Sequence, residues 1–185
     1  MNKLSLAFFG MLFLALMWTG CTKDDPVVPN EEEVITTLTY TLTPTSGTPV
    51  VMTFKDLDGD GGNAPVITGG TLAANTTYTG AIVLLNETET PAENITLEIT
   101  EEADEHQFFF ESTVTGLSVA YGDLDANGKP IGLVSTVTTG AVGSGNVKVT
   151  LRHEPNKTAT GVAGGDITNA GGSTDIEVTF PIDVQ

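Results

Sequence analysis

Apolar and polar residues alternate over most of the chain, and this two-residue period constrains the fold more than any other feature. From Val34 onward, runs rich in Thr, Val, Ile and Phe are separated by clusters of Gly, Pro, Asn and Asp. In one such run, LTYTL, the apolar residues are Leu38, Tyr40 and Leu42. Because successive side chains of a strand point to opposite faces, each run predicts a strand with one buried and one exposed face.

About nine runs have this character, and none of them predicts an amphipathic helix. They are LTYTL, VVMTF, TTYTGAIVLLNE, ITLEI, HQFFFESTV, GLSVAY, IGLVSTVTT, NVKVTLRH and STDIEVTFPIDV. Short strands separated by turn signals are typical of an antiparallel β-sandwich, broadly immunoglobulin-like, and a closed β-barrel is the alternative. We therefore expect an all-β fold in a single domain over residues 34–185. Pro181 falls on the outward face of the last strand and indicates an edge position.

The first 20 residues have the layout of a secretory signal: Lys3, then an apolar stretch that is too short to span a bilayer. Thr19-Gly20-Cys21 resembles a bacterial lipobox, which implies that Cys21 carries diacylglycerol and palmitate and anchors the chain to a membrane. An ordinary signal followed by a free thiol is the alternative. Cys21 is the chain's one cysteine, so acylation would leave no thiol for a disulfide or a metal.

Residues 21–33 contain charges and proline without apolar periodicity, which predicts a disordered acidic tether. Lys23-Asp24-Asp25 resembles the short acidic export signal of surface lipoproteins in Bacteroidota. That resemblance implies an outer-membrane location with the domain on the cell surface, whereas a plain solvated linker would leave open which leaflet the domain faces.

The charge of the chain excludes one class of partner. Without the first 20 residues, 165 of the 185 residues remain, with 24 acidic and six basic side chains and a formal charge of −18. A field of this sign repels phosphate backbones and attracts cations, so we expect no nucleic-acid partner. The one tryptophan, Trp18, lies in the signal, which leaves few rings for stacking against sugars.

Two aspartate-rich loops match the first half of the calcium pattern D-x-[DN]-x-[DN]-G. The oxygen-bearing positions are Asp56, Asp58 and Asp60 in the first loop and Asp123, Asp125 and Asn127 in the second. Side chains at positions one, three and five of a curled loop converge, so each loop is a candidate structural Ca²⁺ site. Ile67 and Val134 stand where an EF-hand has its glutamate, and Asp-Gly and Asn-Gly turns are the alternative interpretation.

The chain has two histidines, and strand parity places both on core-facing positions. His106 is in line with Phe108, and His153 is in line with Leu151. They are candidates for binding a transition metal or haem, with a pair of hydrogen-bonded boundary histidines as the alternative. Glu105 and Glu154 have the opposite parity. No nucleophile elbow or zinc motif is visible, so we expect no enzymatic activity.

One connection, residues 154–172, is long, lacks periodicity and is rich in glycine and asparagine. Loops of this length are usually functional or disordered. It predicts either a recognition loop or a mobile connection.

Several stretches together resemble a family of short flavobacterial (Bacteroidota) surface lipoproteins. They include DLDGDGGNAPV, LAANTTYTGAIVLLNET, EHQFFF, NGKPIG and GDITNAGGSTDIEVTFPI, so the resemblance covers nearly all of the chain after the signal. Members often carry the label "type 1 periplasmic binding fold superfamily protein". That fold is α/β and needs helices that this sequence lacks, so the resemblance implies location and architecture.

These observations favour a non-enzymatic outer-membrane lipoprotein on the cell surface, with a calcium-stabilised β-sandwich that serves in binding, adhesion or as an envelope accessory. The alternative is a lipoprotein that captures a ligand, haem or metal beside an outer-membrane transporter. In that case His106, His153 or residues 154–172 would form the site.

Overall fold

The structure of the protein is a computed structural model that describes residues 33–59 and 61–185. The predicted signal, the predicted lipidation site Cys21, most of the predicted tether and the candidate ligand position Asp60 lie outside these residues. The described residues belong to a compact unit spanning residues 32–185. Within it, no helix has the length and apolar character needed to cross a membrane.

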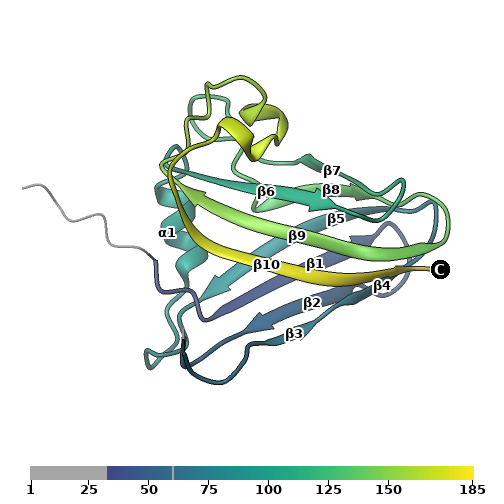
Figure 1. Cartoon of the computed structure of the whole chain (residues 1–185), viewed down its shortest axis with the longest axis horizontal. Helices are drawn as coiled ribbons and strands as arrows, with labels where there is room; N and C mark the ends of the chain where they lie inside the picture. Colours follow the sequence, from purple (N-terminus) through teal and green to yellow (C-terminus); the bar gives the residue numbers. More distant parts are fainter. Residues whose placement is uncertain (1–32, 60) are drawn as a thin grey trace, which may run out of the picture. The chain divides into compact units, whose positions relative to one another are not determined.

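Two sheets face each other and form a sandwich (Figure 1). The six-stranded sheet has the order β3 (Val66–Thr68), β2 (Val50–Lys55), β1 (Thr37–Pro44), β5 (Thr77–Leu85), β8 (Val134–Thr138) and β7 (Ser118–Tyr121). The four-stranded sheet has the order β4 (Gly70–Leu72), β10 (Ser173–Val184), β9 (Gly143–His153) and β6 (His106–Ser112). The predicted all-β sandwich is confirmed, with ten strands in the described residues. Neither sheet closes into a barrel there.

The core lies between the sheets and is built by the predicted alternation. Leu38, Tyr40 and Leu42 of β1 are buried, and the threonines between them are more exposed or face the outer side. Val178 and Phe180 of β10 face them from the other sheet. Each buried large apolar side chain contributes about 1.5–3 kcal/mol relative to an exposed one, which makes this contact the main stabilising term.

The segment ITLEI, which the two-residue period predicts to be a strand, is instead the helix α1 (Ile95–Glu101). The Asn94 side chain accepts a hydrogen bond from the Thr96 amide and caps the helix. Ile95 and Ile99, four residues apart, are buried on one face, while Leu97 is 61% exposed. The strand prediction was wrong because a run of five residues fits both periods, and the cap decides between them.

The strand β10 begins with an irregularity that matters for the site. Thr174 pairs with Arg152 and Ile176 with Leu151, so Asp175 is an extra residue in a β-bulge. At its other end β10 pairs in parallel with β4, so the predicted edge position of this strand was wrong from Ile182 onward. Pro181 comes just before that pairing and lies on the exposed face.

The long connection 154–172 is packed onto the outer face of the four-stranded sheet. It contains two short 3₁₀ helices, η1 (Val162–Gly164) and η2 (Ile167–Asn169). Val162 and Ala170 form a small apolar cluster with Phe109 of β6. The connection therefore has a structural role in covering Phe109, and its recognition role stays a prediction.

Candidate metal centre

Four side chains from distant parts of the sequence converge at one end of the sandwich. They are Glu33 ahead of β1, His106 at the start of β6, His153 at the end of β9 and Asp175 in the bulge of β10. The side chains of Glu33 and His106 are 2% and 0% exposed, and those of His153 and Asp175 are 5% and 0% exposed. One donor atom from each lies within 4.8 Å of the others.

The pairing of β6 with β9 brings the two histidines together. His106 and His153 are directly opposite in the antiparallel register, and their ring centroids are 4.6 Å apart. Their inward direction follows the parity seen in the sequence, since Phe108 and Leu151 are buried on the same face. The two imidazoles therefore form one side of the cluster.

The two carboxylates form its other side. Glu33 Oε1 lies 2.7 Å from His106 Nε2, and Glu33 Oε2 lies 3.5 Å from His153 Nδ1. Asp175 Oδ1 is 3.9 Å from His153 Nδ1, and Asp175 Oδ2 is 4.0 Å from His106 Nε2. Each imidazole thus presents a nitrogen to both carboxylates.

Several of these buried polar atoms have no hydrogen-bond partner among the described residues. They are Glu33 Oε2, His153 Nδ1, Asp175 Oδ1 and Asp175 Oδ2. A buried polar atom without a partner costs about 1–3 kcal/mol, more when it is charged, and folded proteins rarely tolerate several together. Four such atoms aimed at one point indicate a site built to receive a cation.

The pKa values within the cluster reflect its burial and its charges. Burial and the adjacent Glu33 carboxylate raise the pKa of Asp175 to about 7. Burial acts in the same direction on Glu33, but the hydrogen bond with His106 and the positive charge of that imidazole lower its pKa to about 2. Burial lowers the pKa of His106, but the contacts with Glu33 and the Glu102 carbonyl dominate and raise it. The protein alone therefore neutralises Glu33 with His106 and leaves Asp175 without a counter-charge.

A second layer of contacts orients His106. Its Nδ1 lies 3.1 Å from the carbonyl oxygen of Glu102, the C-cap residue that follows α1. The carbonyl can only accept, so Nδ1 carries the hydrogen and Nε2 faces the carboxylates. Metal-binding histidines commonly donate their other N–H to such a carbonyl. The helix α1 thus supplies the group that fixes the ring of His106.

The donor set and its spacing fit a divalent transition metal. Imidazole and carboxylate suit Zn²⁺, Fe²⁺, Mn²⁺ or Ni²⁺, and Zn–N and Zn–O bonds of about 2.0–2.2 Å place ligand atoms about 3.3–3.5 Å apart in a tetrahedron. The separations of 3.5, 3.9 and 4.0 Å need a small contraction to reach that geometry, and the 2.7 Å contact between Glu33 Oε1 and His106 Nε2 must lengthen. Four protein ligands would close the coordination sphere of a tetrahedral ion.

The sequence pointed to the histidines but missed both carboxylates. Glu33 stands at the end of a charged stretch that predicts a tether, yet its side chain is buried. In a regular strand Asp175 would have the opposite parity to Ile176 and would point to solvent, but the bulge turns its side chain inward. The segment STDIEV alternates without a break, so it carries no signal of the bulge.

The first aspartate loop uses its carboxylates as turn caps. Asp56 Oδ1 accepts hydrogen bonds from the amides of Asp58 and Gly59, and Asp58 Oδ2 accepts two from Asn63. Asp58 is exposed, and its hydrogen bonds with Asn63 lower its pKa. With Asp60 outside the described residues, the calcium site here stays a prediction.

In the second aspartate loop a lysine supplies the positive charge. The Lys157 ammonium is buried and lies 3.0 Å from Asp125 Oδ2, and it also donates to the carbonyls of Ala103 and Pro130. Asp125 Oδ1 accepts from the amides of Asn127 and Lys129. Asp125 is thus fully engaged by protein donors.

The other two positions of this loop do not join Asp125. The Asp123 carboxylate accepts from the amides of Gly132 and Val134, and Asn127 contributes its backbone amide. The side-chain oxygens of Asp123, Asp125 and Asn127 therefore do not converge on one point in this conformation. Calcium binding at this loop also stays a prediction.

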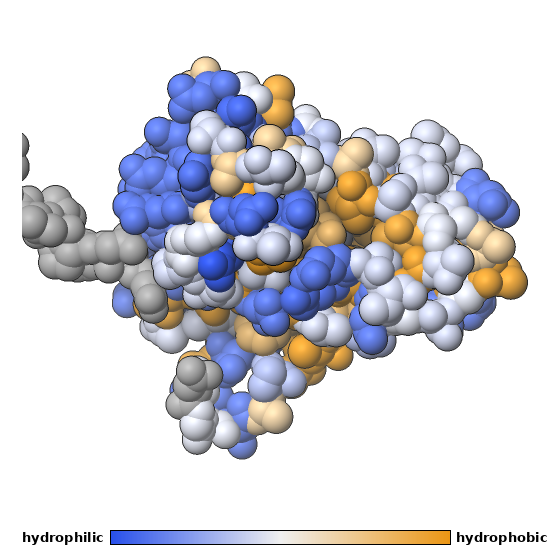
Figure 2. All heavy atoms as spheres, turned by 45° about the horizontal axis from the view of Figure 1, so that its top comes forward, coloured by the Kyte–Doolittle hydropathy of each residue, from blue (hydrophilic) through white to orange (hydrophobic). Residues whose placement is uncertain are grey.

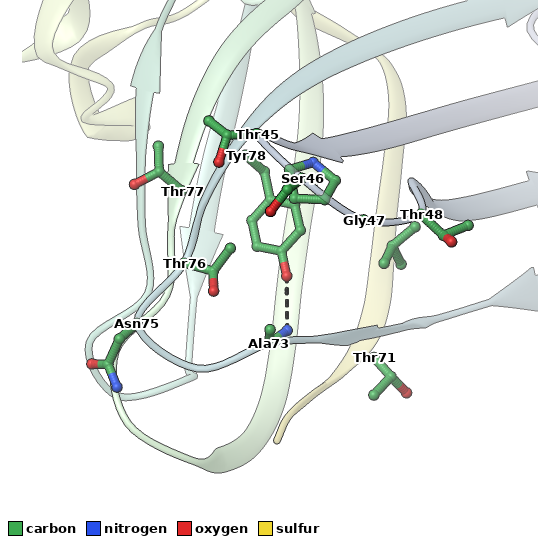
Figure 3. Close-up of a pocket in the computed structure, with 12 residues that line it drawn as sticks. Thr45, Ser46, Gly47, Thr48, Thr71, Ala73, Asn75, Thr76, Thr77 and Tyr78 are labelled. Carbon is green, nitrogen blue, oxygen red and sulfur yellow. Dashed lines mark hydrogen bonds between the residues drawn. The ribbon is translucent and has the colours of Figure 1, made fainter.

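A hollow at the opposite end of the sandwich offers a different chemistry. It has a volume of about 670 Å³ and is lined by the connection after β1 and the start of β5 (Figure 3). The Tyr78 hydroxyl accepts a hydrogen bond from the Ala73 amide there. Its lining holds hydroxyl and amide groups without an acid, a histidine or a basic residue, so it does not suit a metal ion.

Comparison with known proteins gives little to set beside this geometry. No family model matches the chain, and no curated protein matches it. Among solved structures, domains 4 and 5 of the S-layer protein SbsC are similar at 17% identity, over 78% of this chain and 75% of that chain, with a TM-score of 0.30. A likeness at that score carries no argument about function, so the functional case rests on the cluster itself.

Proposed function

We propose that this chain is a lipid-anchored, surface-exposed lipoprotein that binds one divalent transition-metal ion, foremost Zn²⁺, through Glu33, His106, His153 and Asp175. The observation that carries the proposal is the group of buried donor atoms, four of them without a hydrogen-bond partner in the described residues, gathered within bonding range of one ion. The lipobox-like segment before Cys21 and the acidic residues after it support the location.

Binding without catalysis is the role that this ligand set favours. Catalytic zinc sites keep one position open for water or substrate, whereas sites with four protein ligands are closed. The buried cluster belongs to the closed type. We therefore favour retention or capture of a metal, acting beside an outer-membrane transporter, over a hydrolytic role.

A binding measurement on the acylated chain in detergent, freed of metal with a chelator, tests the proposal. Titration with Zn²⁺ against a chromophoric competitor is expected to give one tight site per chain. Asp175→Asn removes a ligand oxygen while keeping the side-chain shape, and should weaken binding at least tenfold. Asp183→Asn makes the same change at an exposed position at the far end of β10 and serves as the control. Equal affinity in the wild type and Asp175→Asn would disprove the site.

The calcium-stabilised adhesion or envelope-accessory module is a second candidate. The carboxylates of half-buried Asp56 and exposed Asp58 favour it, because they lie on a loop that an ion could hold in place. It differs from the first candidate in its ion, so titration of the metal-free chain with Ca²⁺ and with Zn²⁺ separates the two.

A further inference from the structure

A second group of possible ligands lies on the other side of His153. Glu105, His153 and Glu154 have donor atoms within 4.8 Å of one another, and both glutamates are exposed. His153 Nε2 lies 3.8 Å from Glu105 Oε2, while Nδ1 of the same ring faces Glu33 and Asp175. His153 is therefore shared between this outer group and the buried inner group.

The strand register produces this arrangement. Glu105 directly precedes β6 and Glu154 directly follows β9, and His106 pairs with His153 between them. The Glu154 amide donates a 2.6 Å hydrogen bond to the Glu105 carbonyl, which holds the two ends of the ladder together. The Glu105 carboxylate thus lies beside Nε2 of His153, and the Glu154 carboxylate lies within 4.8 Å of a His153 nitrogen.

The imidazole of His153 can serve either group, but only one at a time. A neutral imidazole has one nitrogen with a lone pair and one with a hydrogen. When Nε2 binds an ion, the Nδ1 hydrogen points at Glu33 and Asp175, which are acceptors 3.5 and 3.9 Å away. When Nδ1 binds an ion, the Nε2 hydrogen points at Glu105. Either state gives the ring the carboxylate partner that metal-binding histidines commonly have.

The two groups differ in how they would treat an ion. The outer group has three ligands and exposed carboxylates, so water would complete its coordination, whereas the inner group has four buried ligands. In Figure 2, hydrophilic residues gather over the end of the domain where β10 begins, which suits the arrival of a hydrated cation. His153, with 5% of its side chain exposed, stands between that surface and the inner ligands.

We infer that Glu105, His153 and Glu154 form an outer loading position, from which a divalent transition metal passes to the inner centre as His153 exchanges Nε2 for Nδ1 coordination. This inference rests on the proposed function, since it needs the inner centre to bind a metal. Besides the metal–ligand bonds, the Nδ1–H bond of His153 breaks and an Nε2–H bond forms, with the proton carried by solvent or the adjacent carboxylates. The Nε2 proton that His106 donates to Glu33 is released to solvent when this nitrogen binds the ion.

A competing route starts from the other side of the cluster. A cleft of about 460 Å³ is bordered by the first aspartate loop, the segment before β1 and the start of β10. Asp56, Asp58 and Asp175 are among its residues. An ion that entered here would meet Asp175 without contact with Glu105 or Glu154, so the two routes predict different sensitive residues.

Stopped-flow absorbance with Co²⁺, mixed with the metal-free acylated chain in detergent, separates the two routes. A hydrated outer site gives weak absorbance, and a four-coordinate inner site gives an intense visible band. The double variant Glu105→Gln/Glu154→Gln should slow the rise of the intense band about tenfold or more, within the range that steering charges give, and leave its final height unchanged. Asp56→Asn/Asp58→Asn removes the same charge from the cleft and should leave the rate within twofold.

The outcomes are distinct. The inference would be overturned if the intense band rose slowly in Asp56→Asn/Asp58→Asn and at the wild-type rate in Glu105→Gln/Glu154→Gln. Equal rates in the wild type and both double variants would overturn it too. Absence of the intense band in the wild type would refute the proposed function itself. In Asp175→Asn, weak absorbance that still depends on Glu105 and Glu154 is the expected signature of an ion held at the outer position.

Discussion

Asp175→Asn should stabilise the metal-free protein and remove most of the stabilisation that a bound metal gives. In the metal-free protein the Asp175 carboxylate is buried, both of its oxygens lack hydrogen-bond partners in the described residues, and Glu33 lies beside it. These conditions raise its pKa from 3.8 to about 7. A rise in pKa from 3.8 to about 7 corresponds to at most about 4 kcal/mol of free energy spent on ionising this group in the folded state.

The sign of the pH dependence follows from that shift. Since the folded pKa is raised, the native state binds more protons than the unfolded state between about pH 4 and pH 7. The wild type therefore loses stability as the pH rises through this window. Above pH 7, where Asp175 is ionised, the folded state bears the whole free-energy cost of its buried charge. Asn cannot ionise, so the variant should be more stable than the wild type by up to about 4 kcal/mol at pH 8, and equal to it near pH 4.

Thermal and denaturant unfolding in a chelator at pH 8 and pH 4 test this prediction. For a domain of this size the gain corresponds to a rise in Tm of roughly 10 °C. In Zn²⁺ at a hundredfold excess over its Kd, the wild type should gain about 2.7 kcal/mol and Asp175→Asn should gain far less. Asp183→Asn is the control and should change little. A chelated Asp175→Asn protein that is no more stable than the wild type at pH 8 would refute the electrostatic reasoning.

Three further predictions concern the rest of the domain. Lys157→Met should cost about 3–5 kcal/mol at pH 7 in urea unfolding, because it leaves Asp125 buried without its ammonium partner, and Asp125→Asn in the same protein should restore part of the loss. Burial raises the pKa of Asp125, but hydrogen bonds from the Lys129 amide and Lys157 outweigh burial and hold this pKa below its usual value. The stability difference between the wild type and Lys157→Met should therefore shrink as the pH falls below about 4. Asn94→Ala should cost about 0.5–2 kcal/mol through loss of the α1 cap, whereas equal stability would show that packing alone holds the helix. If the first loop binds Ca²⁺, the ion should raise the Tm of the wild type but not of Asp58→Ala, and an unchanged wild-type Tm would exclude the ion.

Local patterns in the sequence were enough to predict most of the fold. Alternation fixes which side of a strand is apolar, and apolar faces must pair, so the sandwich and the buried positions of Leu38 and Phe180 followed. The same parity placed His106 and His153 on the inner face. For Ile95–Ile99 the strand prediction is wrong, because the apolar residues fit a helix as well as a strand and the Asn94 cap favours the helix.

The metal centre could not be completed from the sequence, because its ligands are set by long-range pairing. The antiparallel register places His106 opposite His153, although 46 positions separate them along the chain. A bulge, which depends on how β10 fits against β9, turns Asp175 inward against its parity. The burial of Glu33 depends on where the segment before β1 meets the other sheet. Neighbours along the chain are enough to specify most of the strands and which face of each is apolar. Which polar side chains share a buried space depends on contacts between strands, and these contacts exist only in the folded domain.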